Sequence, residues 1–282
     1  MILKHIILPG ISLSRVLTPA GSEETFSMHT HTNAEIFFFV KGKGIYHVEG
    51  NEYQLEAGDV FLMRPTEAHF VEPDLSQDYE RIVLNFDPNI FLPFAPDETL
   101  MQPFVHREAG KRNCFRALDF GTNSYQKYLY DMFNCDGDRL SFLANLILLL
   151  KNIGEVFSTA DLGNSGPNTM EYHMIRYINQ NVHREIPIKE LTERFYLSRA
   201  QLCLRFKKAT GTSVGKYISI KRLMLACQRI RSGEKPTDVF TECGYQDYST
   251  FYRAYTRLFG HSPKEESDFK DVSVHDDYIS LS

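Results

Sequence analysis

The sequence predicts an α+β multidomain protein, with an N-terminal β-barrel, helices that trail the barrel, and an all-α C-terminal domain. Three observations predict this fold class. Residues 25–86 contain short β-rich runs separated by turn residues. Residues 115–157 space their apolar side chains by three and four positions, as amphipathic helices do. Residues 169–269 contain no strand-like run, and their pattern indicates consecutive short helices.

The barrel strands are indicated by "AEIFFFVKGKGIYHVEGNEYQL", which begins at Ala34. Its apolar runs at 36–40, 45–48 and 53–55 are separated by Gly-Lys-Gly and Glu-Gly-Asn. Turns of this composition join antiparallel strands tightly. We therefore expect an all-β barrel or sandwich in this region.

Two helices are expected after the barrel, over 115–133 and 140–157. The segment "LSFLANLILLL" in the second is apolar around most of its circumference, so it must be covered. Either the barrel covers it, or a second copy of the chain does. Both alternatives remain open, and the second makes the protein a homodimer.

The chain divides at "STADLGNSGPN", residues 158–168, which has almost nothing to bury and is the best linker candidate. We expect one domain over 1–157, with the barrel and its trailing helices, and an all-α domain over 169–270. An acidic tail over 271–282 completes the chain, and we expect a short helix and a disordered end after Pro263.

Composition limits the location and the partners. The five cysteines form no C-x-x-C pair, which favours a reducing compartment over a disulfide framework. The longest apolar run, 146–150, is too short to cross a bilayer, and the N-terminus shows no secretory signal. The simplest prediction is a cytoplasmic protein with no membrane partner.

Charge is unevenly distributed, although the chain as a whole carries −5. Residues 171–264 hold 17 Lys and Arg against 8 Asp and Glu, whereas the remainder holds 14 against 28. A basic third on an acidic background is expected if one domain binds a polyanion and the other does not.

The C-terminal region repeats one order of elements. "IPIKELTERF", "YLS" and "RAQLCLRFKKATG" indicate a helix, a turn with Ser198 as cap, and a second helix closed by Gly211. The order recurs in "PTDVFTECGYQDYSTFYRAYTRLFG", and "VGKYISIKRLMLACQRIRSG" between the two is long enough for a rigid spacer helix. Helix, turn and helix form the unit whose second helix enters the major groove, so we expect double-stranded DNA as partner.

Residues 170–264 resemble the DNA-binding domain of AraC/XylS-type transcription regulators. The resemblance is carried by "LSRAQLCLRFKKATGTSVGKYI" and "CGYQDYSTFYRAYTRLFGHSP". It implies a sequence-specific regulator and favours activation by contact with RNA polymerase, although repression in the absence of ligand stays open on physical grounds. We expect no catalytic residue and no cofactor. It also assigns DNA contacts to residues of the two second helices: Ala200, Gln201, Cys203, Leu204, Lys207, Lys208, Tyr248, Ser249, Tyr252, Arg253, Thr256 and Arg257.

These residues divide by chemistry. Arg253 is the best single candidate for base reading, because a guanidinium can bind O6 and N7 of guanine together. Gln201 is the polar reader of the first unit. The phosphate contacts are assigned to Lys207, Lys208, Thr256 and Arg257.

The sequence departs from the family pattern at two places. Leu204 stands where Arg is frequent, and the neighbouring Arg205 stands where an apolar residue is usual. Pro236 and Phe240 also differ from the usual residues before the second reading helix, so we expect shifted packing there.

The N-terminal region resembles the cupin barrel in H-x-H-x3-E-x6-G, from His29 to Gly42, and in "GDVFLMRPTEAH", which ends at His69. Two His, a Glu and a third His are ligand types for a divalent transition metal. The second motif has Glu67 in place of Gly and one residue fewer before His69, which leaves open whether His69 reaches the others. If a metal binds, its ligands are His29, His31, Glu35 and His69.

We expect the barrel to bind a small effector such as a carbohydrate rather than a catalytic metal, and we expect no enzyme activity. The expected effector-binding residues are His29, His31, Glu35, Phe37, Tyr46, Arg64 and His69. Two alternatives stay open. One is a metal-dependent cupin enzyme or metal sensor with a DNA-binding tail. The other is a constitutive DNA-binding protein whose barrel only dimerises.

Overall fold

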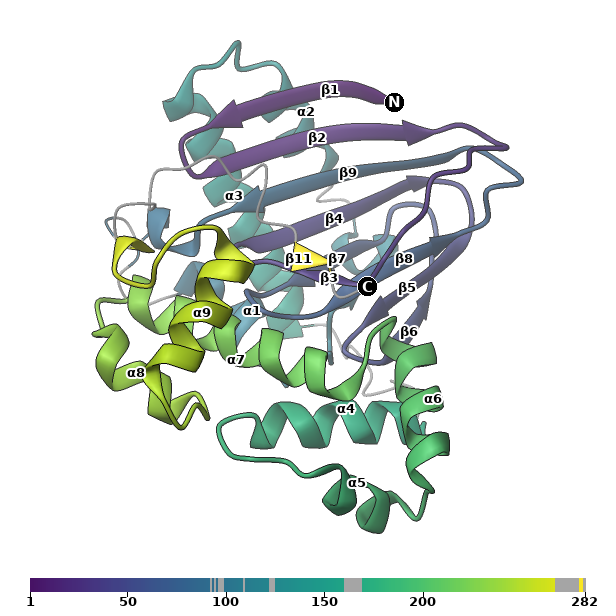
Figure 1. The fold of residues 1–282 in the computed structure, drawn as a ribbon. Coiled ribbons are helices and arrows are strands. Elements are labelled where there is room, and N and C mark those ends of the chain that lie inside the picture. Colours follow the sequence, from purple (N-terminus) through teal and green to yellow (C-terminus); the bar gives the residue numbers. More distant parts are fainter. Residues whose placement is uncertain are drawn as a thin grey trace.

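The computed structural model describes residues 1–91, 93, 95, 99–108, 110–121, 125–159, 169–266 and the backbone of 279–280. Two antiparallel β-sheets form the N-terminal barrel (Figure 1). The first has the order β1 (Ile2–Leu8), β2 (Ile11–Thr18), β9 (Tyr79–Phe86), β4 (Ala34–Lys41), β7 (Val60–Met63) and β10 (Cys114–Phe115). The second has the order β11 (Ile279–Ser280), β3 (His29–Thr30), β8 (His69–Pro73), β5 (Gly44–Val48) and β6 (Asn51–Gln54). The predicted barrel is confirmed, and the sequence reasoning missed its first two strands.

Strand β4 explains the continuous apolar run that the sequence contains. Ile36 and Phe38 face one core of the protein, together with side chains of the trailing helices. Phe37 and Phe39, which alternate with them, face the second core between the two sheets. Because both faces of the strand are covered, no polar alternation is needed.

Between the barrel and the C-terminal helices, the described residues form short 3₁₀ turns and three α-helices. They are η1 (Pro88–Phe91), η2 (Thr99–Met101), α1 (Gln102–Val105), η3 (Ala117–Phe120), α2 (Gln126–Phe133) and α3 (Arg139–Thr159). The predicted helix over 140–157 is confirmed. The prediction for 115–133 was wrong in its first part, because Phe115 pairs with Val60 in the sheet and α2 begins at Gln126.

Helix α3 is long and apolar enough to cross a membrane by composition alone. Its buried side chains, among them Phe142, Leu146 and Leu150, join the core on the outer face of the first sheet. Leu140 and Leu148 remain exposed, at 75% and 46%. The barrel therefore covers most of the apolar circumference, and a narrow apolar strip remains at the surface.

The predicted linker and tail are only partly within the described residues. Ser158 and Thr159 belong to the last turn of α3, and 160–168 lie outside the described residues. Of the tail, 271–278 and 281–282 also lie outside them. Contrary to the expected disordered end, the backbone of 279–280 pairs with β3 at His29 and Thr30.

The C-terminal part contains α4 (Met170–Asn181), α5 (Ile188–Phe195), α6 (Arg199–Thr210), α7 (Val214–Arg231), α8 (Pro236–Glu242) and α9 (Tyr248–Phe259). The predicted caps are confirmed, since Ser198 begins α6 through a capping box and Gly211 ends it at φ +70°. Helix α7 contributes Met224 to one core and Leu223 to the other. It is the spacer that the sequence predicts, and it holds the two units together.

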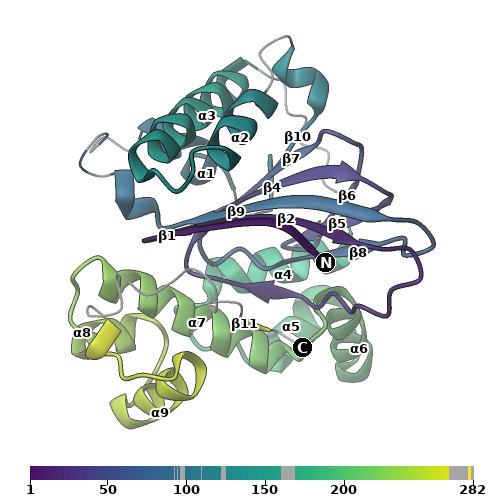
Figure 2. The ribbon, with the colours of Figure 1, turned by 90° about the horizontal axis from the view of Figure 1, so that it is seen from above.

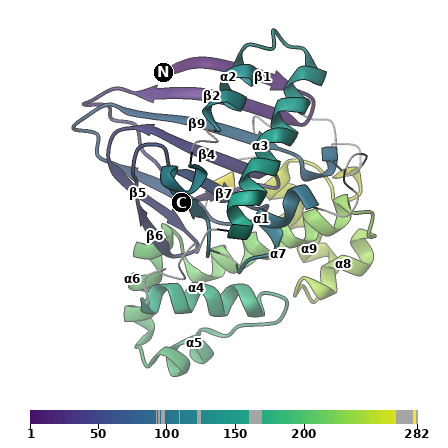
Figure 3. The same cartoon turned by 180° about the vertical axis from the view of Figure 1, so that it is seen from behind.

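Three layers are visible from above (Figure 2). Helices α1–α3 cover one side of the sheets, and α4–α9 lie on the opposite side. The view from behind shows α2 and α3 crossing the first sheet, with α4 and α5 beyond the barrel (Figure 3). The barrel therefore lies between its own covering helices and the C-terminal helices α4–α9.

Candidate functional site

Four polar side chains from three strands and one loop gather at the end of the barrel. Nε2 of His31 lies 3.2 Å from Oε2 of Glu35, and Nε2 of His69 lies 3.5 Å from Oε1 of the same carboxylate. The rings of His29 and His69 are 4.4 Å apart between centroids. The structure thus brings together all four residues of the sequence motif, and the shortened spacing before His69 does not displace it.

The backbone fixes how these histidines present their nitrogens. Nδ1 of His29, His31 and His69 each contacts a backbone carbonyl, at distances of 3.0, 2.8 and 2.9 Å. A carbonyl oxygen can only accept, so Nδ1 must be the protonated nitrogen in all three rings. For His31 and His69, a neutral ring then presents a lone pair to the Glu35 carboxylate. That contact is favourable only if a proton or another cation is shared there.

Burial and neighbouring charges shift the pKa values of the titratable residues in this site. Burial, with His69 beside it, lowers the pKa of His29 to about 3. Burial alone would raise the pKa of Glu35, but the charge of His69 and the hydrogen bond from His31 hold it well below its usual range. Burial opposes the charge on His69, yet the facing Glu35 raises the pKa of His69. The carboxylate is therefore ionised and His29 neutral at neutral pH.

The donor set fits a divalent transition metal. His29, Glu35 and His69 each offer a ligand atom, and these atoms lie within 4.8 Å of one another. Nitrogen and carboxylate oxygen ligands with Nδ1 held by carbonyls are the usual surroundings of such an ion. His31 contacts the same carboxylate and completes the candidate set.

The other residues predicted to bind the effector lie in two different surroundings. Tyr46 donates a hydrogen bond of 3.3 Å to Oε1 of Glu35, and its ring lies 4.6 Å from that of Phe37. Arg64 is placed elsewhere, because its guanidinium donates to the carbonyl of Arg107. The expected ligand space between the sheets is occupied by buried side chains: Phe37, Phe39, Tyr46, Val48, Leu55, Phe61, Met63, Val71 and Tyr79.

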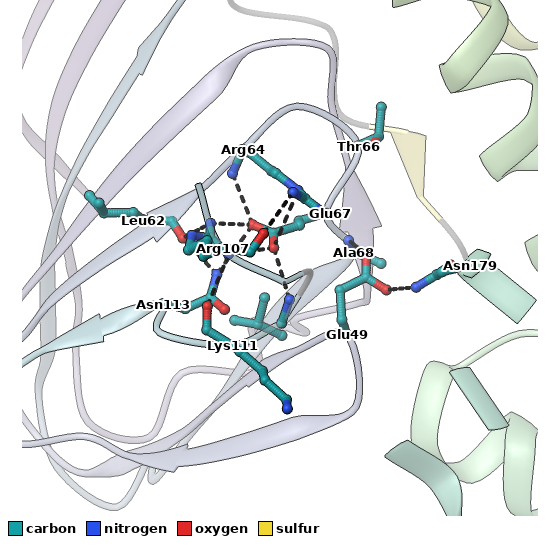
Figure 4. A network of polar contacts seen from close by, with 12 residues as sticks. Glu49, Leu62, Arg64, Thr66, Glu67, Ala68, Arg107, Lys111, Asn113 and Asn179 are labelled. Atoms are coloured by element: carbon teal, nitrogen blue, oxygen red, sulfur yellow. Dashed lines mark hydrogen bonds and ion pairs between the residues drawn. The ribbon is translucent and has the colours of Figure 1, made fainter. Parts of the chain in front are cut away.

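Glu67 is a residue whose role the sequence reasoning missed. Its carboxylate accepts two hydrogen bonds of 2.7 Å from Arg107, one of 2.9 Å from the Gly110 amide and one from Asn113 (Figure 4). Burial would raise the pKa of Glu67, but Arg107 lowers it to about 2. Glu67 therefore fixes the turn that leads into His69. The sequence did indicate that this position is unusual, because Glu67 stands where the cupin motif has Gly.

The first reading helix, α6, presents its assigned residues to solvent. Ala200, Gln201, Cys203, Leu204, Lys207 and Lys208 are all exposed. The Gln201 side chain also accepts a hydrogen bond of 3.0 Å from the Ser198 amide, so its carbonyl end caps the helix. In this arrangement only its amide nitrogen is left to donate to a base.

The second reading helix, α9, has the same organisation. Ser249, Tyr252, Arg253 and Arg257 are exposed, whereas Tyr248 and Thr256 are half-buried. Among the described residues, the Arg253 guanidinium donates a hydrogen bond to the carbonyl of Ser249, one turn earlier on its own helix. A flexible cation on an exposed face can reach a base edge or a phosphate.

The departures from the family pattern have structural explanations. Arg205 is half exposed and pairs with Glu171 of α4 at 2.9 Å, so it is not placed in the core. Pro236 is the first residue of α8, where its missing N–H costs nothing. Phe240 packs against Tyr248 and Phe251, with ring centroids 5.5 and 6.3 Å apart.

Comparison with known proteins agrees with this organisation. Residues 16–118 match the family model of the AraC-like ligand binding domain, and residues 191–267 match a helix-turn-helix domain model. The chain belongs to the AraC family of transcription regulators. This AraC-type regulator therefore combines a ligand-binding barrel with a sequence-specific DNA-binding domain.

Several curated relatives match this AraC-type regulator over most of its length. The transcriptional activator RhaS of Escherichia fergusonii is 23% identical, over 94% of this chain and 96% of the relative. The Msm operon regulatory protein of Streptococcus mutans is 23% identical, over 87% and 89%. The probable transcriptional regulator LumQ of Photobacterium leiognathi is 36% identical, over 31% of this chain and 36% of its own.

Proposed function

We propose that the chain is a transcription activator controlled by a small polar effector that binds at His29, His31, Glu35 and His69. One observation carries this proposal. The neighbours of the binding residues, Met28, Ala68 and Phe70, pack in the same core as α4, α6 and α7. The residues next to the binding histidines in the sequence therefore contact the DNA-binding domain directly.

The chemistry of the site favours a polyol such as a carbohydrate as effector. Imidazole and carboxylate groups hydrogen-bond to hydroxyl groups, and Tyr46 adds a hydroxyl group that contacts Glu35. Because the space between the sheets is filled, we place the effector at the His29 end of the barrel rather than in its centre.

DNA recognition is assigned to the exposed faces of α6 and α9. Arg253 and Gln201 are proposed to read bases, and Lys207, Lys208, Thr256 and Arg257 to hold phosphates. The names of the RhaS relatives support activation, and contact with RNA polymerase is part of that proposal. We place the protein in the cytoplasm, where its DNA is, and assign it no enzyme activity.

A homodimer is proposed through the apolar strip on the covering helices. Tyr130, Leu140 and Leu148 are exposed by 69%, 75% and 46% on α2 and α3. Exposed aliphatic and aromatic side chains on adjacent helices are typical of an interface. The domain limits 1–157 and 169–270 belong to the same proposal, with the first part dimerising and the second binding DNA.

A metal sensor is the second candidate, because the ligand atoms of His29, Glu35 and His69 lie close enough together to hold a divalent cation. The decisive experiment is sequence selection with the purified chain, followed by binding to the selected DNA with and without each candidate effector. The leading proposal expects one DNA motif and an affinity that depends on a small organic molecule. A response to the cation alone supports the metal sensor, and a response to neither supports constitutive DNA binding.

A further inference from the structure

The barrel and the DNA-binding helices meet at a buried carboxylate. Glu49 lies in the turn between β5 and β6 and is 2% exposed. Its Oε2 accepts hydrogen bonds of 2.6 Å from Asn179 and 2.7 Å from the Tyr217 hydroxyl, and its Oε1 pairs with the ammonium group of Lys221. We call these four residues the domain junction. Figure 4 shows Glu49 directed from the barrel toward Asn179 of α4.

The turn also fits closely against α4 in shape. A Cβ atom on Gly50 would lie 2.8 Å from Cδ1 of Ile175 and 3.2 Å from Cα of Tyr172. Glu49 and Gly50 both have left-handed backbone conformations, at φ +49° and +83°. A non-glycine residue takes this conformation only where its surroundings hold it. Charge and shape therefore select the same docked arrangement.

The domain junction holds the helix that orients both reading units. Tyr217 and Lys221 lie one turn apart on α7, and α7 contributes to the cores of both helix-turn-helix units. Any change in how Glu49 holds α7 therefore changes the position of both units relative to the barrel.

The domain junction is also directly connected to the histidine site. Oε1 of Glu49 accepts a hydrogen bond of 2.7 Å from the amide of Ala68, which precedes His69. Lys221 donates to the carbonyl of Thr66, and the amide of Thr66 donates to the carbonyl of His31 at 2.9 Å. The turn from Thr66 to His69 thus contacts the effector site through Thr66 and His69. It contacts the domain junction through Thr66 and Ala68.

We propose that the domain junction is the switch that transmits effector binding to the DNA-binding domain. This inference rests on the proposed function. Glu35 contacts His31 and His69 directly, so an organic ligand that enters between them must separate these side chains. The displacement moves the turn that carries Ala68 and Thr66. Glu49 and Lys221 then lose their shared partners, and α7 is released from the barrel.

Amide hydrogen exchange of the free full-length chain tests the docking step without DNA or effector. Glu49→Gln keeps the size of the side chain and removes its charge. Exchange should quicken about tenfold at 172–179 and 217–221, and stay unchanged in β2 and β9, because only the docked surface opens. Glu52→Gln removes the same charge from a 59% exposed position of the same hairpin and should leave exchange unchanged.

A second variant acts through shape rather than charge. Gly50→Val should quicken exchange over the same two segments, because its side chain meets Ile175. Unchanged exchange in both variants would overturn the proposal. Equal acceleration throughout the barrel would overturn it as well, since Glu49 would then serve the fold rather than the docking.

The transmission step is tested by combining two variants. His69→Ala should alter exchange at 217–221 in the wild-type background and add nothing further in the Glu49→Gln background, because both act through Ala68. Simple addition of the two effects would show that the site and the domain junction are independent. If the wild-type chain selects no DNA motif, the proposed function is refuted. The exchange results on the docking of the two domains would still stand.

Discussion

The Glu67 carboxylate and the Arg107 guanidinium are joined by two hydrogen bonds of 2.7 Å, between side chains that are 1% and 0% exposed. Glu67 lies two residues before His69, and Arg107 lies in the segment that follows α1. Because both charges are removed from water, each depends on the other. The pair therefore fixes the turn on which the effector site depends.

Glu67→Gln should lower the free energy of unfolding by about 3 to 5 kcal/mol, because it leaves the Arg107 charge buried without a counter-charge. Urea denaturation measures this change. Glu108→Gln is the matched control, since Glu108 is 54% exposed in its ion pairs and should change stability by less than about 1 kcal/mol. Equal effects of the two substitutions would contradict the assignment.

Acid should remove the same stabilisation. Arg107 holds the pKa of Glu67 at about 2 in the folded protein, below its ordinary value of 4.5. The group therefore stabilises the fold fully above pH 4.5, and this contribution is lost as pH falls from 4.5 toward 2. Thermal unfolding across this range should show a shallower pH dependence for Glu67→Gln than for wild type. Parallel curves would refute the linkage.

His69→Ala should abolish the response to the effector. A ligand present at about 100 times its dissociation constant stabilises the wild-type chain by about 2.7 kcal/mol. A thermal-shift panel of carbohydrates, with Zn²⁺ and Mn²⁺ measured separately, should give a stabilising compound for wild type and for His106→Ala, but not for His69→Ala. His106 is an exposed histidine outside the site. A compound that still stabilises His69→Ala binds elsewhere.

Arg253→Ala should weaken binding to the selected DNA by about 1 to 3 kcal/mol and relax the preference at a single base pair. Competition against single-base variants of the DNA measures this. Lys264→Ala, an exposed cation beyond α9, serves as control. Uniform weakening on every DNA sequence would show that Arg253 contacts a phosphate.

Lys207→Ala should reduce the dependence of log affinity on log salt by about one unit, because one fewer counterion is released. The measurement is fluorescence anisotropy at several salt concentrations. Lys189→Ala removes a charge that is 83% exposed on α5 and should leave the slope unchanged. An unchanged slope for Lys207→Ala would exclude a phosphate contact.

Local patterns in the sequence determined the architecture of the DNA-binding part. The cap at Ser198, the closing Gly211 and the apolar spacing of the helices depend on residues three or four apart, so they are visible in the chain itself. The barrel strands at 36–40 and 45–48 were predictable for the same reason. The structure of residues 114–120 was not predictable, because Phe115 pairs in the sheet with Val60, which is far away in the sequence.

The histidine motif named four residues of the site, but only the tertiary structure decided how they are used. The backbone carbonyls that contact each Nδ1 are not distinguished by residue type, and the Arg107 partner of Glu67 lies 40 positions away in the sequence. The same holds for Glu49, which appears in the sequence as an ordinary acidic turn residue. It becomes a buried partner of Lys221 because packing of α4 and α7 against the barrel removes it from water.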